Sequence, residues 1–207
     1  MSTTERPADA ATRLTDAALT LFRQQGYAAT SVNELCTAAG VSKGAFFHHF
    51  PNKDALAIAA ARAWATGTGA MFAAADYHDL SNAADRVLAY LDLRIALLDG
   101  PLPEITCYAG TMVQEIYEGS TDIRDACAEA IFGHASTLED DIAAALNDAG
   151  NSEIDAAGLS RHLQAVLQGG FILSKAKGDS TPAKESVEHL KRYLDFLFTP
   201  QRQERRK

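Results

Sequence analysis

The amino-acid sequence predicts an all-α protein of about nine helices, and three observations support this fold class. Hydrophobic residues make up 47% of the 207 residues, and they lean on alanine, which with leucine is among the strongest helix formers. Apolar residues recur at intervals of three and four, the spacing of one helix face. Glycine and proline separate these periodic segments, and none of them shows the polar–apolar alternation of a half-buried strand.

The N-terminal part predicts three helices in quick succession. The first is expected over residues 8–25, since Gly26 follows the last apolar position. The second begins after Ser31, which has a glutamate three residues later and so forms a capping box. The third is short, capped by Ser42 and ended by Pro51. The turn "AAGVS" between the second and third helices has the length expected of a helix-turn-helix.

The rest of the chain predicts a further helix from about residue 52 and five more. These five are expected over residues 81–99, 103–118, 121–149, 155–178 and 182–198. The expected organisation is a helix-turn-helix domain over 1–52, a larger helical domain over 53–199, and a disordered tail over 200–207.

The charge of the chain is unevenly distributed. The net charge is −8, which alone argues against a nucleic-acid binder. Residues 1–62, however, carry six Lys and Arg against five Asp and Glu, whereas the remainder carries 13 against 22. The acidity therefore belongs to the C-terminal two-thirds, and the N-terminal part remains free to approach DNA.

Several classes of protein are not expected. Three cysteines at wide spacing fit neither a disulfide framework nor a zinc site. The chain has no glycine-rich phosphate loop, paired-histidine metal motif or nucleophile elbow, so we expect no enzyme, cofactor or metal. His134, near Glu139, is expected on a solvated charged face. A cytoplasmic protein is expected, because no signal peptide and no apolar run of about 18 residues is found.

The segment "GVSKGAFFHHFPNK" combines aromatic and basic residues in the third helix. Helical spacing puts Phe46, His49 and Phe50 on one face and Gly44, Phe47 and His48 on the other. The first face can pack on the two preceding helices, so the second must face outward, with Lys43 and Lys53 at its ends. A small, polar and cation-flanked face suits a DNA major groove. The alternative is a packing unit that never touches DNA.

The stretch "FRQQGYAATSVNELCTAAGVSKGAFFHHFPNKDAL" resembles the N-terminal DNA-binding domain of the TetR family of bacterial transcriptional regulators. The resemblance runs without interruption from Leu14 to Leu56. It includes the family's patterns G-Y/F-x-x-T-S/T, A-G-V-S-K-G and H-F-x-x-K in register. The later helices match this family in number and length rather than in any motif.

The resemblance implies which residues contact DNA. They are Thr30, Ser31, Ser42, Lys43, Gly44, Ala45, Phe47, His48 and Lys53. Either Thr30 or Ser31 would contact a phosphate, as would Lys53, and His48 would contact a phosphate or a base. Phe47 stands where the family usually has a tyrosine, so the hydrogen bond of that hydroxyl group is missing here. His49 is expected to pack or to form a hydrogen bond within the domain.

The resemblance also implies a homodimer, formed by the last two helices as a four-helix bundle. The expected interface consists of Gly169, Gly170, Ser174, Leu190, Tyr193, Leu194 and Leu197. A dimer would place two recognition helices about 34 Å apart, the spacing needed to read a palindrome. The alternative is that these residues close the core of the monomer itself.

The middle helices are expected to enclose a pocket for a small, mostly apolar ligand. The candidate lining is Trp64, Met71, Phe72, Tyr90, Arg94, Cys107, Tyr108, Met112 and Tyr117. Ordinary core packing is the alternative role for each of these residues. Cys107 has a second alternative, as the reactive thiol of an electrophile or redox sensor, because it lies early in a predicted helix.

The sequence therefore predicts a transcriptional regulator that a small-molecule ligand releases from a palindromic DNA operator. The preference for a repressor over an activator comes from the family resemblance alone. The main alternative is a dimeric ligand-binding or interaction protein whose helix-turn-helix does not bind DNA. Salt dependence separates these two, because only contacts with DNA phosphates release counterions.

Overall fold

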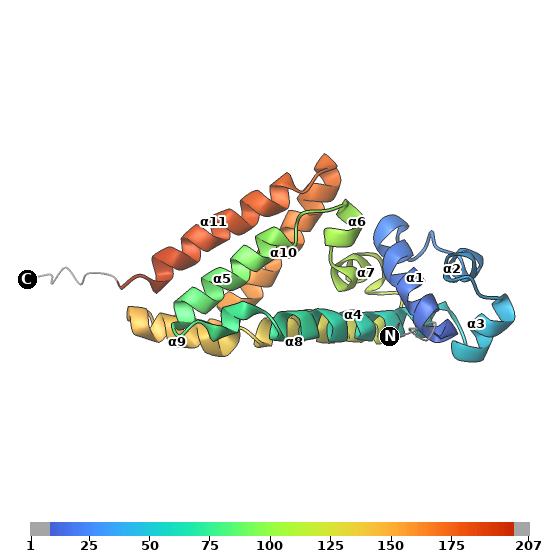
Figure 1. The fold of residues 1–207 in the computed structure, drawn as a ribbon, viewed down its shortest axis with the longest axis horizontal. Helices are drawn as coiled ribbons and strands as arrows, with labels where there is room; N and C mark the ends of the chain where they lie inside the picture. Colours follow the sequence, from blue (N-terminus) through green and yellow to red (C-terminus); the bar gives the residue numbers. More distant parts are fainter. Residues whose placement is uncertain (1–8, 201–207) are drawn as a thin grey trace, which may run out of the picture. The chain divides into compact units, whose positions relative to one another are not determined.

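The computed structural model describes residues 9–200, and this range folds into helices joined by short turns (Figure 1). No strand occurs within it, which confirms the all-α class. The predicted tail lies almost wholly outside the described residues. The helices are α1 (Ala10–Gln25), α2 (Val32–Ala39), α3 (Lys43–His49), α4 (Lys53–Ala73), the 3-10 helix η1 (Asp76–Asp79), α5 (Ala83–Ala96), α6 (Leu102–Ile105), α7 (Tyr108–Ile116), α8 (Thr121–Ser136), α9 (Glu139–Ala149), α10 (Ala156–Lys177) and α11 (Thr181–Phe198).

The prediction of one helix over 121–149 is wrong, because the helix is interrupted between α8 and α9. The hydroxyl group of Ser136 donates a hydrogen bond to the Phe132 carbonyl, and that of Thr137 donates to the His134 carbonyl. These side chains compete with the backbone for helical acceptors. The Thr137 amide then bonds only three residues back, and the helix ends.

The prediction of one helix over 103–118 is also wrong. Thr106 adopts an extended conformation, with ψ 151°, and separates the short helix α6 from α7. Cys107 is the N-cap of α7, and its sulfur accepts a hydrogen bond from the Gly110 amide at 3.4 Å. These two breaks account for the difference between the nine helices expected and the eleven α-helices found in the described range.

The described residues form two compact units. The first contains the chain up to Gly67 together with Cys107–Ala130, and the second contains Thr68–Thr106 together with the chain from Ile131. Helix α4 contributes to both units, since it spans Lys53–Ala73. The functional boundary at residue 52 stays a prediction.

The first unit is built on the contacts of α1 with α2, α3 and α7. Its core side chains are fully buried, and they include Leu14, Phe22, Leu35, Phe46 and Leu56. Helix α7 joins this core through Tyr108, whose hydroxyl group donates to the Ala57 carbonyl at 3.0 Å. A segment more than 50 residues later in the chain is thus part of the N-terminal unit.

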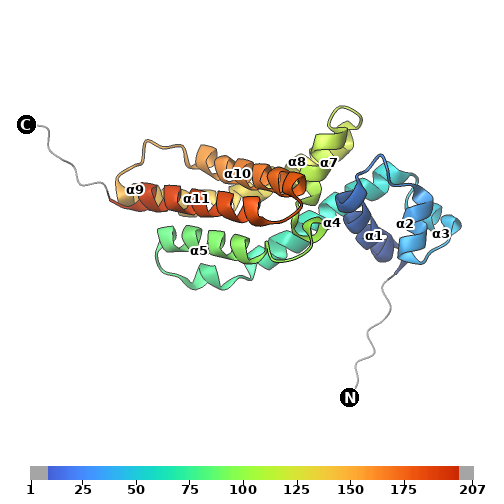
Figure 2. The ribbon, with the colours of Figure 1, turned by 90° about the horizontal axis from the view of Figure 1, so that it is seen from above.

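The second unit consists mainly of α5, α9, α10 and α11. Figure 2 shows α11 alongside both α10 and α5, the neighbours with which it makes most contact. Helices α10 and α11 approach closely at Gly170, where an added Cβ atom would lie 3.0 Å from the Ala183 Cα atom. Ser174 supports the same contact, because its hydroxyl oxygen accepts a hydrogen bond from the Ala183 amide.

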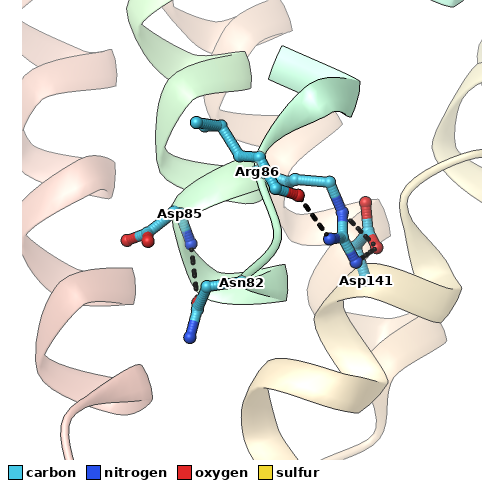
Figure 3. Close-up of polar contacts among 5 residues, drawn as sticks. Asn82, Asp85, Arg86 and Asp141 are labelled. Carbon is cyan, nitrogen blue, oxygen red and sulfur yellow. Dashed lines mark hydrogen bonds and ion pairs between the residues drawn. The ribbon is translucent and has the colours of Figure 1, made fainter.

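An ion pair joins α5 to α9 within the second unit (Figure 3). Two guanidinium nitrogens of Arg86 donate to the same carboxylate oxygen of Asp141, at 3.0 and 2.6 Å. A third bond runs from Arg86 to the Leu80 carbonyl at 2.8 Å. The Asn82 side chain caps α5 by accepting from the Asp85 amide. Asp141 and Leu80 thus hold Arg86 in one position.

Neither a membrane-spanning helix nor a metal-binding cluster is found in the described range. No helix there is both long and apolar enough to cross a bilayer. No three His, Cys, Asp or Glu side chains of residues 9–200 gather at distances suited to a metal ion.

Candidate nucleic-acid interface

The turn between α2 and α3 depends on Gly40. This residue has a left-handed conformation with φ 61°, which glycine adopts without steric cost. An added Cβ atom there would meet no atom within 4 Å, so the backbone angle is the reason for glycine. The amide of Val41 closes the turn on the Cys36 carbonyl at 2.9 Å. Ser42 then caps α3 by accepting from the Ala45 amide at 3.1 Å.

Helix α3 has one buried face and one exposed face. Phe46 is fully buried, and its ring lies 5.1 Å from that of Phe47 and 6.2 Å from that of Phe50. The exposed residues are Ser42, Lys43, Gly44, Phe47, His48 and His49. The predicted orientation of Phe46 inward and of Gly44, Phe47 and His48 outward is therefore confirmed.

The expectation that His49 packs within the domain is wrong. Its side chain is exposed, and its ring lies 5.0 Å from that of His48. Helix α3 ends at His49, and Phe50 turns away with an extended backbone and becomes half-buried. Phe50 therefore takes the inward place that the helical spacing assigned to both residues.

Gly44 lies inside the first turn of α3 with nothing packed against it. An added Cβ atom would find only the Ser42 hydroxyl oxygen, at 3.8 Å, within 4 Å. Its φ is not in the left-handed region either, so neither packing nor backbone conformation requires a glycine. A glycine inside a helix costs about 1 kcal/mol relative to alanine. The absence of a side chain there leaves room for something outside the chain.

Of the two candidate phosphate contacts at the start of α2, only Ser31 is exposed. Thr30 is fully buried, and its hydroxyl group donates to the Gly26 carbonyl at 2.7 Å. Ser31 forms the predicted capping box, in which its hydroxyl oxygen accepts from the Glu34 amide and Glu34 accepts from the Ser31 amide. Thr30 thus positions the loop between α1 and α2, whereas Ser31 lies exposed to solvent at the N-terminus of α2.

Lys53 has an internal role that the sequence did not reveal. Its ammonium group donates to the carbonyls of Tyr27 and Thr30, at 2.8 and 2.9 Å, and lies 3.9 Å from the centre of the Tyr27 ring. Burial lowers the pKa of Lys53, while the charges of Asp54 and Glu115 oppose this shift. The Tyr27 hydroxyl group in turn donates to Asp54. Lys53 therefore fixes the loop between α1 and α2.

Glu115 of α7 is the residue of this unit that sequence reasoning missed. Its carboxylate accepts hydrogen bonds from the Tyr27 and Ala28 amides, both at 2.6 Å. Gly26 makes room for it, since an added Cβ atom would lie 2.8 Å from a Glu115 oxygen. No local sequence pattern predicts this contact, because 87 or more residues separate the partners. We call this contact the Glu115 clamp.

Replacing Glu115 with alanine is expected to lower the free energy of unfolding of the first unit by about 1–2 kcal/mol. Two charge-assisted hydrogen bonds are lost, but the site is partly exposed and water replaces part of their strength. Chemical denaturation and hydrogen exchange at Tyr27 and Ala28 measure the effect. Glu118→Ala is the control, and an equal loss in both variants would contradict a specific clamp.

The predicted pocket residues divide between the two units. Trp64, Cys107, Tyr108, Met112 and Tyr117 belong to the first, and Met71, Phe72, Tyr90 and Arg94 to the second. In the first unit Tyr108 and Met112 are core residues with no exposed surface. Tyr117 and Met71 lie at the surface, 52% and 40% exposed. A hollow of about 360 Å³ between α1 and α2 is lined by none of these nine residues.

In the second unit, Phe72, Tyr90 and Arg94 come together with His134. The Phe72 ring lies 5.4 Å from the Tyr90 ring and 4.6 Å from the His134 ring. The Arg94 guanidinium lies 5.2 Å from the centre of the Phe72 ring. The Tyr90 hydroxyl group is hydrogen-bonded to His134 Nε2 at 2.9 Å. The expectation of a solvated His134 is wrong, since burial and the charge of Arg94 lower its pKa to about 4.

Most of the residues predicted for a dimer interface pack inside the protomer. Gly170, Ser174, Leu190, Leu194 and Leu197 are buried in the second unit and are not available to a partner. Gly169 is half-exposed and Tyr193 is exposed. Exposed apolar side chains accompany them on the hairpin of α10 and α11, namely Ile172, Leu173 and Phe196. The rings of His162 and Tyr193, 6.2 Å apart, join the two helices beside these residues.

The arrangement in the first unit defines a class of protein. A short helix, capped by Ser42 and anchored by Phe46, exposes lysine, glycine and histidine after a glycine turn. This is the geometry of a helix-turn-helix DNA-binding protein.

Comparison with known families identifies the chain more closely. Residues 14–60 match the family described as "Bacterial regulatory proteins, tetR family". Residues 83–189, half of the chain, match "Transcriptional regulator LmrA/YxaF-like, C-terminal domain". The chain belongs to the TetR family, and it is a helix-turn-helix transcriptional regulator.

Two curated relatives resemble the chain over most of its length. The HTH-type transcriptional regulator LmrA of Bacillus subtilis is 28% identical over 186 residues, which cover 84% of this chain and 90% of LmrA. The uncharacterized HTH-type transcriptional regulator YxaF of the same organism is 27% identical over 178 residues, covering 84% and 89%.

Solved structures share the fold. Regulatory protein TetR from Rhodobacter sphaeroides superposes with a TM-score of 0.76 at 20% identity, covering 89% of this chain and 98% of that one. The reduced form of NemR from E. coli gives 0.73 at 20% identity, covering 89% and 96%. At these identities the likeness concerns the fold alone.

Proposed function

We propose that the protein is a dimeric repressor that binds an inverted-repeat DNA operator through α3 and is released by a small-molecule ligand. Ser31, Ser42, Lys43, Gly44, Ala45, Phe47 and His48 form the proposed DNA-contacting surface. It would act in the cytoplasm, where bacterial DNA lies. Thr30 and Lys53 support this surface by holding the loop between α1 and α2.

The observation that carries this proposal is the open surface at Gly44. The chain carries a destabilising glycine in a helix where its own packing leaves space for a side chain. Lys43 and His48 flank this gap and are exposed. A cationic face without a protruding side chain allows the backbone to come close to base edges and phosphates in a major groove.

Release by a ligand needs only a modest energy difference. A ligand that binds the DNA-incompetent conformation about 1–3 kcal/mol more tightly than the competent one weakens operator binding by the corresponding factor. The proposal places the ligand in the second unit, where Phe72, Tyr90 and His134 form an aromatic cluster. The main alternative is a protein that binds ligand but not DNA.

The experiment that tests this function is selection of DNA from a random-sequence library by the purified protein at physiological salt. Enrichment of an inverted repeat is the expected result, because a two-fold dimer presents α3 twice. The affinity for the selected site should fall steeply with salt concentration as phosphate contacts release counterions. No enrichment by a folded dimer would contradict the proposal.

A further inference from the structure

The second unit contains a basic side chain without a charged partner. Arg94 is half-buried on α5, and its guanidinium rests on the Phe72 ring. It forms no ion pair with any carboxylate of the described residues. Arg86, eight residues earlier on the same helix, shows the usual arrangement, because Asp141 and Leu80 take up its donors (Figure 3). Arg94 therefore keeps its donors available.

A second unmatched donor lies in the same cluster. Gln164 of α10 is 7% exposed, and its Nε2 atom has no hydrogen-bond partner among the described residues. The Gln164 amide lies near the Tyr90 hydroxyl group but outside the geometry of a full hydrogen bond; the charge of Arg94 and this amide both oppose the rise that burial causes in the pKa of Tyr90. A buried amide without an acceptor is destabilising, so an acceptor from outside the chain would relieve it.

His134 completes the cluster on the side of α8. Its lowered pKa leaves the ring neutral at pH 7, so it does not compete with Arg94 as a charge. His134 and Arg94 are only half-buried, which makes the cluster accessible at these two residues, whereas the rings of Phe72, Tyr77 and Tyr90 lie buried behind them. The cluster thus offers an available cation and an unmatched amide beside apolar rings.

We infer that this cluster binds the anionic group of the ligand, a carboxylate attached to an apolar or aromatic body. Arg94 supplies the charge, the Gln164 amide donates a hydrogen bond, and the half-buried ring of His134 contacts the apolar part. A guanidinium and a carboxylate form strong, directional hydrogen bonds when they are partly desolvated. This inference rests on the proposed function, since it names the chemical class of the releasing ligand.

Calorimetric titration of the full chain with matched probes tests the inference. Naphthalene-2-carboxylate and octanoate are compared with naphthalene-2-carboxamide and octanamide, which have nearly the same shape but no charge. The carboxylates are expected to bind at least about tenfold more tightly than the amides. Equal affinity of the two forms, or no binding of either carboxylate at millimolar concentration, would overturn the inference.

Variants locate the binding to the cluster. Arg94→Gln is expected to weaken carboxylate binding about tenfold and to leave amide binding unchanged. Arg192→Gln, an equal change of charge at an exposed position of α11, should leave both unchanged. Gln164→Leu should weaken carboxylate binding without lowering thermal stability, because it removes an unmatched buried donor. Full binding by Arg94→Gln would refute the assignment.

Operator release distinguishes the two proposals. The carboxylates should displace the wild-type protein from its selected DNA but not the Arg94→Gln variant. Displacement by the neutral amides alone would preserve the proposed function and overturn the anionic ligand. Binding of carboxylates through Arg94 by a protein that selects no DNA would instead overturn the proposed function and support the anion site.

Discussion

Replacing Lys43 and His48 together with alanine is expected to weaken operator binding by at least about 100-fold. Each contact to a base or phosphate contributes roughly 1–3 kcal/mol, and a dimer loses each contact twice. Both side chains are exposed and neither belongs to the buried core of the first unit, so helix content and dimerisation should remain unchanged. Fluorescence anisotropy with labelled operator at fixed salt measures the affinity.

A control and a companion variant sharpen this experiment. Arg124→Ala with His78→Ala removes a cationic side chain and a histidine from exposed positions outside α3 and the hairpin of α10 and α11, and should leave the affinity unchanged. Gly44→Ala should raise stability by up to about 1 kcal/mol and yet weaken binding, because its methyl group enters the open gap. Full operator binding by the Lys43 and His48 double variant would show that α3 is not the recognition helix.

Replacing Leu173 and Phe196 together with glutamate is expected to convert the dimer into a folded monomer. These side chains are 55% and 62% exposed on the hairpin of α10 and α11. In a dimer they would be buried, and burying four unpaired carboxylates is prohibitive. Light scattering after size-exclusion chromatography measures the mass. Operator affinity should decrease as the dimer is lost.

Phe132→Glu provides the matched control for the dimer. Phe132 is 56% exposed but belongs to α8 and not to the hairpin of α10 and α11. The dimer should survive this change. Dissociation by Phe132→Glu alone would place the interface on another surface, as would a double variant that remains a dimer.

The fold class and the DNA-contacting helix could be predicted because their signals are local. Capping residues and a left-handed glycine mark the ends of α2 and α3 within a few positions of the sequence. The spacing of apolar residues also placed Phe46 inside and Phe47 outside. The breaks at Thr106 and Thr137 were missed because helical periodicity continues across them, while the backbone does not.

The proposed dimer interface and the cluster around Tyr90 and His134 could not be predicted in the same way. Helix α11 carries an inner apolar set that includes Leu190 and Leu194 and an outer set with Tyr193 and Phe196. Periodicity shows that both sets avoid water, but not whether the protomer or a partner covers them. The hydrogen bond between Tyr90 and His134 spans 44 residues, and only the tertiary structure reveals it.

The Glu115 clamp limits how this regulator can be recombined with others. A simple chimeric regulator would join a DNA-reading head to a foreign sensor at a single crossover point. Here a graft that ends at Gly67 would leave behind Tyr108 and Glu115, and with them the acceptor for the Tyr27 and Ala28 amides. The transferable module is therefore discontinuous in sequence, and a functional chimera needs a second crossover that carries α7 along with the head.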